Sequence, residues 1–131
     1  MLVLFSFSTK AQDCILDIGG KDTATIIQIF QLNDEQKAKL DVLVNELSIQ
    51  RRLQEEKVEE LLATHPQKTP EELTILGQKH EDLKESMLLT TVIYDQKLLS
   101  LFNEKQYERY VALCASAKRT PIPVLETETP E

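Results

Sequence analysis

The chain has 131 residues, enough for one domain. Charged residues make up 28% of it and aromatic residues only 5%, a balance that favours helices over sheets. The net charge of −7 argues against a nucleic-acid surface, because such a surface needs clustered Lys and Arg. No apolar run approaches the roughly 20 residues that span a bilayer. We therefore expect a soluble all-α protein that does not bind nucleic acid and whose mature chain does not insert into a membrane.

Residues 1–11 differ in composition from everything that follows. A short apolar run leads to Thr9 and Ala11, which places small residues at the −3 and −1 positions of a signal cleavage site after Ala11. We interpret this segment as the remnant of an export signal, with the true start upstream and Met1 inside the signal. The alternative is a frayed terminus or a short apolar strand. Export predicts a periplasmic protein of a Gram-negative bacterium, with residues 12–22 as an N-terminal arm.

The two cysteines, Cys14 and Cys114, lie near opposite ends of the mature chain. In an oxidising compartment they could pair and tie the arm to the last helix. The alternative is two unpaired thiols, and the sequence alone does not choose between them.

Residues 23–31 form a short apolar segment that could be a strand, but its position before a strong helix start favours a short packing helix. Leu32, Asn33 and Gln36 then mark the start of a long helix, which Pro66 ends. Asn33 is a favourable N-cap, and Gln36, three residues later, completes a capping box.

A loop over residues 64–70 turns the chain back. Thr69 as N-cap, Pro70 at the first helical position and Glu72 form a second start signal. A short loop between two long helices makes them antiparallel neighbours, so the sequence predicts a long helical hairpin. Its base is apolar on almost every side from residue 87 to 101, whereas its distal half is thin and charged.

A third start signal, Phe102, Asn103 and Gln106, repeats the pattern of residues 32–36 seventy positions later and begins a short last helix. The repeat suggests a weak internal two-fold relation. The alternative is two ordinary N-caps, because Asn-x-x-Gln is a common pattern. The tail, residues 119–131, contains Pro, Thr and Glu without periodicity and is expected to be disordered.

The two Asn-x-x-Gln motifs resemble the LTxxQ pair of the Spy/CpxP family of periplasmic proteins. Asn replaces Thr in both motifs, which preserves N-cap chemistry, and Phe102 replaces Leu in the second. The resemblance covers residues 23–118. It implies a bent hairpin with short flanking helices that pairs into a cradle-like homodimer. It also implies an ATP-independent chaperone, an envelope-stress adaptor or a metal sensor, although the family's well-known chaperones present a positive cradle and this chain is acidic.

A candidate dimer or client surface is expected in the distal half of the hairpin. Its apolar members are Leu53, Val58, Leu73 and Leu76. Apolar side chains among charges suit weak, reversible binding, so we expect a chaperone or adaptor that binds unfolded or envelope proteins. One alternative is a periplasmic metal-binding or sensor protein of the same family. Another is a cytoplasmic helical adaptor, if residues 1–11 are not a signal.

Metal and enzyme chemistry receive little support from the sequence. His65 and His80 are the only histidines and only weak metal candidates, because they do not form a His-x-x-x-His pair. The sequence has no Gly-rich phosphate loop and no recognisable Ser–His–acid motif. We therefore expect no catalytic residue, no metal and no cofactor.

Overall fold

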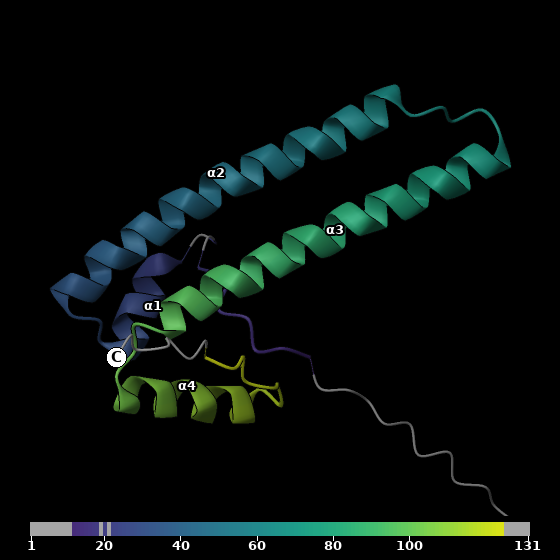
Figure 1. The fold of residues 1–131 in the computed structure, drawn as a ribbon. Helices are drawn as coiled ribbons and strands as arrows, with labels where there is room; N and C mark the ends of the chain where they lie inside the picture. The colour runs from purple at the N-terminus through teal and green to yellow at the C-terminus, as the bar shows by residue number, and fades with distance from the viewer. Residues whose placement is uncertain (1–11, 19, 21, 125–131) are drawn as a thin grey trace, which may run out of the picture.

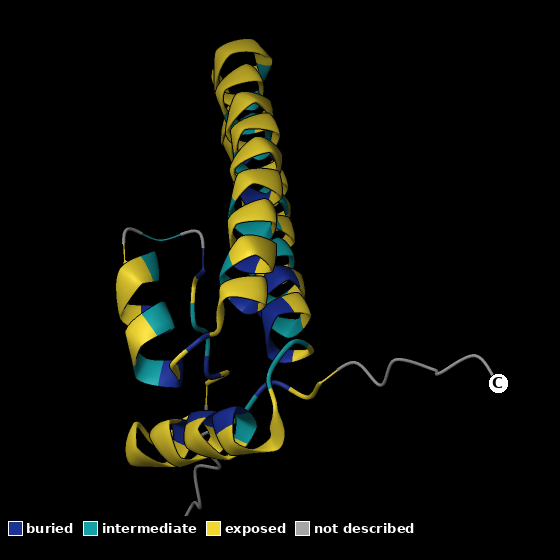
Figure 2. Ribbon diagram, turned by 90° about the vertical axis from the view of Figure 1, so that its left-hand side faces the viewer, coloured by how far each residue is buried: buried dark blue, intermediate teal, exposed yellow. Residues whose placement is uncertain are grey.

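The computed structural model describes residues 12–18, 20 and 22–124, and these residues form four helices (Figure 1). Their bounds are Thr23–Phe30 for α1, Asp34–Thr64 for α2, Pro70–Leu99 for α3 and Glu104–Ser116 for α4. The two long helices, α2 and α3, run antiparallel side by side, and α1 and α4 lie at the base of this hairpin (Figures 1 and 2). The predicted all-α hairpin with short flanking helices is confirmed. The cradle-like dimer stays a prediction.

Three of these four helices begin at a capping box. At α2 the Asn33 side chain accepts a hydrogen bond from the Gln36 backbone N–H at 2.9 Å, and the Gln36 side chain accepts from the Asn33 N–H at 3.0 Å. Asn103 and Gln106 make the same two bonds at α4, both at 2.9 Å. Thr69 and Glu72 cap α3 in the same way. All three start signals read from the sequence are therefore present.

The two glutamines of the Asn-x-x-Gln motifs also bind each other. Gln36 Nε2 donates to Gln106 Oε1 at 2.8 Å, and Gln106 Nε2 donates to Gln36 Oε1 at 3.0 Å. Each amide then donates to a backbone carbonyl of the opposite turn, Gln36 to Leu101 O at 2.8 Å and Gln106 to Phe30 O at 3.0 Å. The turn between α1 and α2 is thus joined to the turn between α3 and α4 by a nearly symmetric network.

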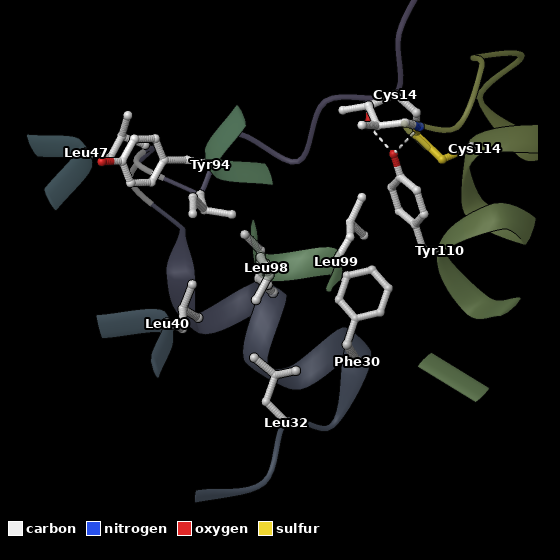
Figure 3. Close-up of a cluster of buried hydrophobic side chains, with 13 residues drawn as sticks. Cys14, Phe30, Leu32, Leu40, Leu47, Tyr94, Leu98, Leu99, Tyr110 and Cys114 are labelled. Atoms are coloured by element: carbon white, nitrogen blue, oxygen red, sulfur yellow. Dashed lines mark hydrogen bonds between the residues drawn. A yellow bond between two sulfur atoms is a disulfide. The ribbon is translucent and has the colours of Figure 1, made fainter. Parts of the chain in front are cut away.

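Apolar side chains pack around this network. The Phe30 and Phe102 rings lie 4.7 Å apart between centroids, and Leu32 is 5% exposed. The core that continues from them lies at the base of the hairpin (Figures 2 and 3). Its other members with no exposed surface come from the arm and from three of the helices: Ile18, Leu40, Leu47, Leu98, Tyr110 and Cys114.

The ends of the described chain close this core. Residues 12–18 and 119–124 run together, with Cys14 N donating to Thr120 O at 2.8 Å and Thr120 N donating to Gln12 O at 2.9 Å. Ile122 is 2% exposed. The expected disorder therefore does not hold for residues 119–124, because Ile122 fills a core position. The predicted signal remnant, 1–11, and the rest of the predicted tail, 125–131, lie outside the described residues.

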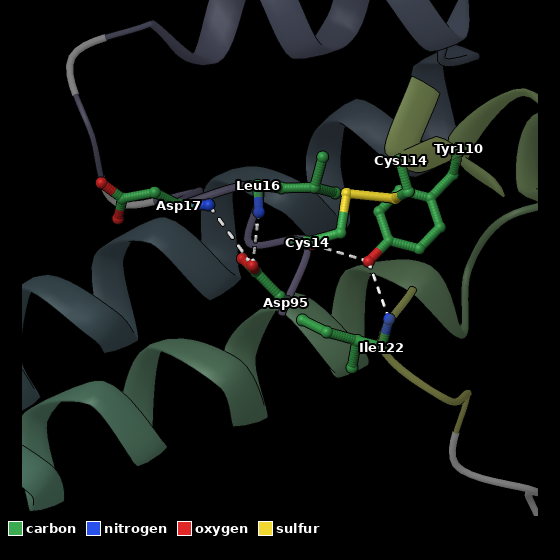
Figure 4. Close-up of a disulfide and its surroundings, with 7 residues drawn as sticks. All are labelled: Cys14, Leu16, Asp17, Asp95, Tyr110, Cys114 and Ile122. Atoms are coloured by element: carbon green, nitrogen blue, oxygen red, sulfur yellow. Dashed lines mark hydrogen bonds between the residues drawn. A yellow bond between two sulfur atoms is a disulfide. The ribbon is translucent and has the colours of Figure 1, made fainter. Parts of the chain in front are cut away.

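Cys14 and Cys114 form a disulfide that ties the arm to α4 (Figure 4). Beside it, the Tyr110 hydroxyl donates to Cys14 O at 2.7 Å and accepts from Ile122 N–H at 3.0 Å. One tyrosine therefore holds both ends of the described chain next to the covalent bridge.

Replacing Cys14 and Cys114 together by Ser is expected to lower the free energy of unfolding by about 4–5 kcal/mol. The bridge spans 100 residues, and cutting it restores loop entropy to the unfolded chain. Urea unfolding followed by circular dichroism measures this loss. A loss below about 1 kcal/mol would contradict the structural role of the bridge.

Replacing Gln36 or Gln106 by Ala is expected to cost about 1–3 kcal/mol in each case, because buried polar groups lose their partners. The double variant should cost clearly less than the sum, since the two side chains share their hydrogen bonds. Chemical unfolding of the four proteins completes the cycle. Gln50→Ala, an exposed change on α2, serves as control with an expected effect within about 0.5 kcal/mol. Additive losses would show that the network does not form.

Candidate interaction surface

The seam between α2 and α3 follows a coiled-coil spacing. Its less exposed positions alternate at intervals of four and three residues on both helices. On α2 they are Leu40, Val44, Leu47, Arg51, Gln54, Val58 and Leu61, and the C-cap residue His65 continues the series. On α3 they are Leu76, His80, Leu83, Met87, Thr90 and Tyr94.

A polar layer divides this seam into two parts. Gln54 Nε2 donates to Thr90 Oγ1 at 2.8 Å, and an Arg51 guanidinium N–H donates to Thr91 Oγ1 at 3.3 Å. Beyond this layer, the distal half relies on half-buried side chains, and Leu76 is its one buried residue among those described. The distal half therefore buries little apolar surface of its own (Figure 2).

The four residues predicted for the candidate surface differ in how far their side chains are exposed. Leu53 and Leu73 are 47% and 51% exposed, as a surface that contacts other proteins requires. Val58 is half-buried in the seam. Leu76 is only 8% exposed, so its assignment to an accessible surface is wrong. Its position in the four-and-three spacing of α3 directs it towards α2.

An open groove of about 490 Å³ runs between the two long helices in this distal half. Leu61 of α2 and Leu83 of α3 supply its apolar lining. The charged residues beside them come from both helices and have both signs: Lys57, Glu60, Lys79 and Asp82. The volume of the groove is within the range of about 300–1,000 Å³ that is typical of ligand pockets in proteins.

The two sides of the groove repeat one pattern. On α2, Leu53, Lys57 and Leu61 follow each other at intervals of four residues, which places them on one helical stripe. On α3, Ile75, Lys79 and Leu83 do the same. The first residue of each stripe is exposed, Leu53 by 47% and Ile75 by 51%. Each exposed residue therefore lies one helical turn from a lysine that lines the groove, Leu53 from Lys57 and Ile75 from Lys79.

The charged side chains of the groove form no ion pairs among the described residues, although the Asp82 carboxylate accepts a hydrogen bond from Gln78 Nε2 at 3.0 Å. Within residues 12–18, 20 and 22–124, no salt bridge involves Lys57, Glu60, Lys79 or Asp82. Sequence reasoning found the Leu53 end of this surface but missed the groove. The sequence feature that could have indicated the groove is the apolar–Lys–Leu stripe that both long helices carry. These two stripes form a site only when the hairpin brings them together.

The two histidines, the weak metal candidates of the sequence, both lie along the distal seam. His65 ends α2 with its Nδ1 2.8 Å from Pro66 O, and His80 is half-buried in the seam. No group of three or more His, Cys, Asp or Glu side chains in the described part of the chain is arranged to hold a metal ion. In the same residues, no helix is both long enough and apolar enough to cross a membrane.

Asp95 is a buried polar residue that the sequence reading did not single out. It has no exposed surface, and its carboxylate accepts backbone N–H bonds from Leu16 at 2.7 Å and Asp17 at 3.3 Å (Figure 4). The Ile18 N–H donates to the same carboxylate at 3.4 Å. A lone acid in the apolar stretch of α3 was the available signal, because a buried charge requires partners. Asp17 in turn forms an ion pair with Arg51, so the arm also contacts the polar layer of the seam.

Burial raises the pKa of Asp95 to about 6, against the opposing effect of the three N–H donors. The folded state then holds this proton more tightly than the unfolded chain does. The contribution of protonated Asp95 to the free energy of unfolding is complete below about pH 4. It is lost as the pH rises through about 6.

The difference in unfolding free energy between the native protein and Asp95→Asn should therefore fall by about 2–3 kcal/mol between pH 4 and pH 7. The comparison with Asn removes the contributions of the other carboxylates, which both proteins share. Urea unfolding over this pH range measures the difference. A difference that does not vary with pH would contradict the raised pKa.

No family model, curated protein or solved structure matches this chain. The function of the groove and of the exposed apolar side chains must therefore be inferred from their own geometry and chemistry.

Proposed function

We propose that the protein is an exported, ATP-independent chaperone or envelope-stress adaptor that holds unfolded segments of other proteins on the distal half of its hairpin. The observation that carries this proposal is the groove lined by Leu61 and Leu83, with exposed Leu53 and Ile75 on the same helical stripes. An unfolded segment can place apolar side chains there without displacing any element of the hairpin.

The wider surface of the hairpin supports the same proposal. Most of the large apolar side chains that remain exposed belong to α2 and α3. They are Val42, Ile49, Leu53, Leu62, Leu73, Ile75, Leu88, Leu89 and Ile93. Apolar groups distributed among polar ones provide many small contacts. Each contact contributes about 25 cal/mol for every Å² of apolar surface that it buries. Binding of this kind is weak and reversible, and it needs no nucleotide.

The proposed compartment is supported by the disulfide between Cys14 and Cys114, since disulfides persist in oxidising environments such as the periplasm. The predicted signal remnant at residues 1–11 points the same way. The resemblance to the Spy/CpxP family rests on the two Asn-x-x-Gln motifs and the order of the helices. A homodimer remains an expectation from that resemblance.

Replacing Leu53 and Ile75 together by Ser should reduce the suppression of client aggregation severalfold, because the helical stripes that enter the groove lose exposed apolar area. A denatured client is diluted into buffer without ATP, and light scattering is followed with increasing amounts of the purified protein. The control replaces Val111 and Val124 by Ser, two exposed side chains outside the hairpin.

The control variant should suppress aggregation as well as the native protein does. Equal loss in both variants would contradict a site on the hairpin. Failure of the native protein to suppress aggregation at excess would reject the chaperone activity itself. Circular dichroism verifies that each variant is folded.

A further inference from the structure

The negative charge of the protein is concentrated in the part of the hairpin that contains the groove, around a lining in which Glu60 and Asp82 are balanced by Lys57 and Lys79. Residues 55–85 contain nine acidic and four basic side chains, a net charge of −5 out of −7 for the whole chain. This segment comprises the distal parts of α2 and α3 and the loop between them. The apolar lining of the groove is therefore surrounded by an excess of carboxylates.

The carboxylates are also accessible. Glu60 and Asp82 line the groove, and each is exposed. Glu56, Glu59 and Glu85 are exposed on the same parts of the two helices. Among the described residues, none of these five forms a salt bridge within the chain.

We propose that the distal half of the hairpin selects unfolded segments that combine aliphatic or aromatic side chains with a net positive charge. This inference rests on the proposed chaperone function and names the class of client. Apolar side chains of the client would contact Leu61 and Leu83, while its Lys and Arg side chains would approach Glu60, Asp82 and the carboxylates around them. Acidic segments with the same apolar content would be repelled, and such repulsion is an effective source of specificity.

The same charge identifies the occupant as a client and not a second copy of the chain. Two distal halves packed on each other would bring two net charges of −5 together. A basic segment is instead attracted to the exposed carboxylates. Salt weakens this attraction, because the Debye length is about 8 Å at physiological ionic strength. Selectivity should therefore be strongest at low salt.

The first experiment compares two fluorescein-labelled peptides that share the same leucines and phenylalanines. One has Lys and the other Glu at every intervening position. Fluorescence anisotropy with the purified, disulfide-bonded protein should show the Lys peptide binding at least about tenfold more tightly at low salt, with the ratio decreasing as NaCl is added. Equal affinities, tighter binding of the Glu peptide or no binding of either peptide would overturn the selectivity.

The second experiment changes the protein. Glu60→Gln with Asp82→Asn should weaken binding of the Lys peptide severalfold, because two carboxylates of the groove are neutralised. The matched control, Glu104→Gln with Glu108→Gln, makes the same change in net charge on exposed residues of α4 and should alter affinity less than about twofold. If both pairs of substitutions weaken binding of the Lys peptide equally, the affinity depends on the total charge of the protein and not on the groove.

Aggregation suppression separates this inference from the function on which it rests. A protein that suppresses aggregation but does not distinguish the two peptides retains the chaperone activity and loses the proposed selectivity. A protein that binds the Lys peptide selectively but does not suppress aggregation retains the selectivity and loses the chaperone activity. The comparison of peptides uses the unaltered protein, so it decides the question even if a variant fails to fold.

Discussion

The reciprocal amide pair of Gln36 and Gln106 is the interaction on which the arrangement of the four helices depends. Each glutamine caps its own helix and also donates to a carbonyl of the opposite turn. An amide side chain is suited to this position because it donates and accepts at once. A carboxylate or an aliphatic side chain would leave at least one of these buried groups without a partner.

Around that network, the two ends of the described chain complete the core. The arm is held at Cys14 by the disulfide and the Tyr110 hydroxyl, and at residues 16–18 by the Asp95 carboxylate (Figure 4). A small domain has limited apolar surface to bury, so covalent and polar contacts contribute a larger share of its stability. The base is consequently closed and specific in its contacts.

The distal half of the hairpin has the opposite character. Beyond the polar layer of Arg51 and Gln54, the seam is half-buried and the groove is open. A client surface requires apolar groups that are not already satisfied within the protein, and a rigid base allows the distal half to present them. The acidic charge of residues 55–85 adds a preference among clients and disfavours contact between two copies at this place.

Local patterns in the sequence determined the helices, because capping boxes act between residues three positions apart and the hairpin follows from a short loop. The starts at Asn33, Thr69 and Asn103 and the antiparallel pair were predictable for that reason. The sequence also indicated two exposed leucines of the surface, Leu53 and Leu73.

Tertiary structure alone decided the contacts between distant segments. These are the glutamine pair, the burial of Asp95 beneath the arm, the pairing of the cysteines and the order of residues 119–124. It also turned Leu76 into the seam and joined the stripes of Leu61 and Leu83 into a groove. Helical periodicity shows which residues share a face of one helix, but the neighbour of that face depends on how the whole chain packs.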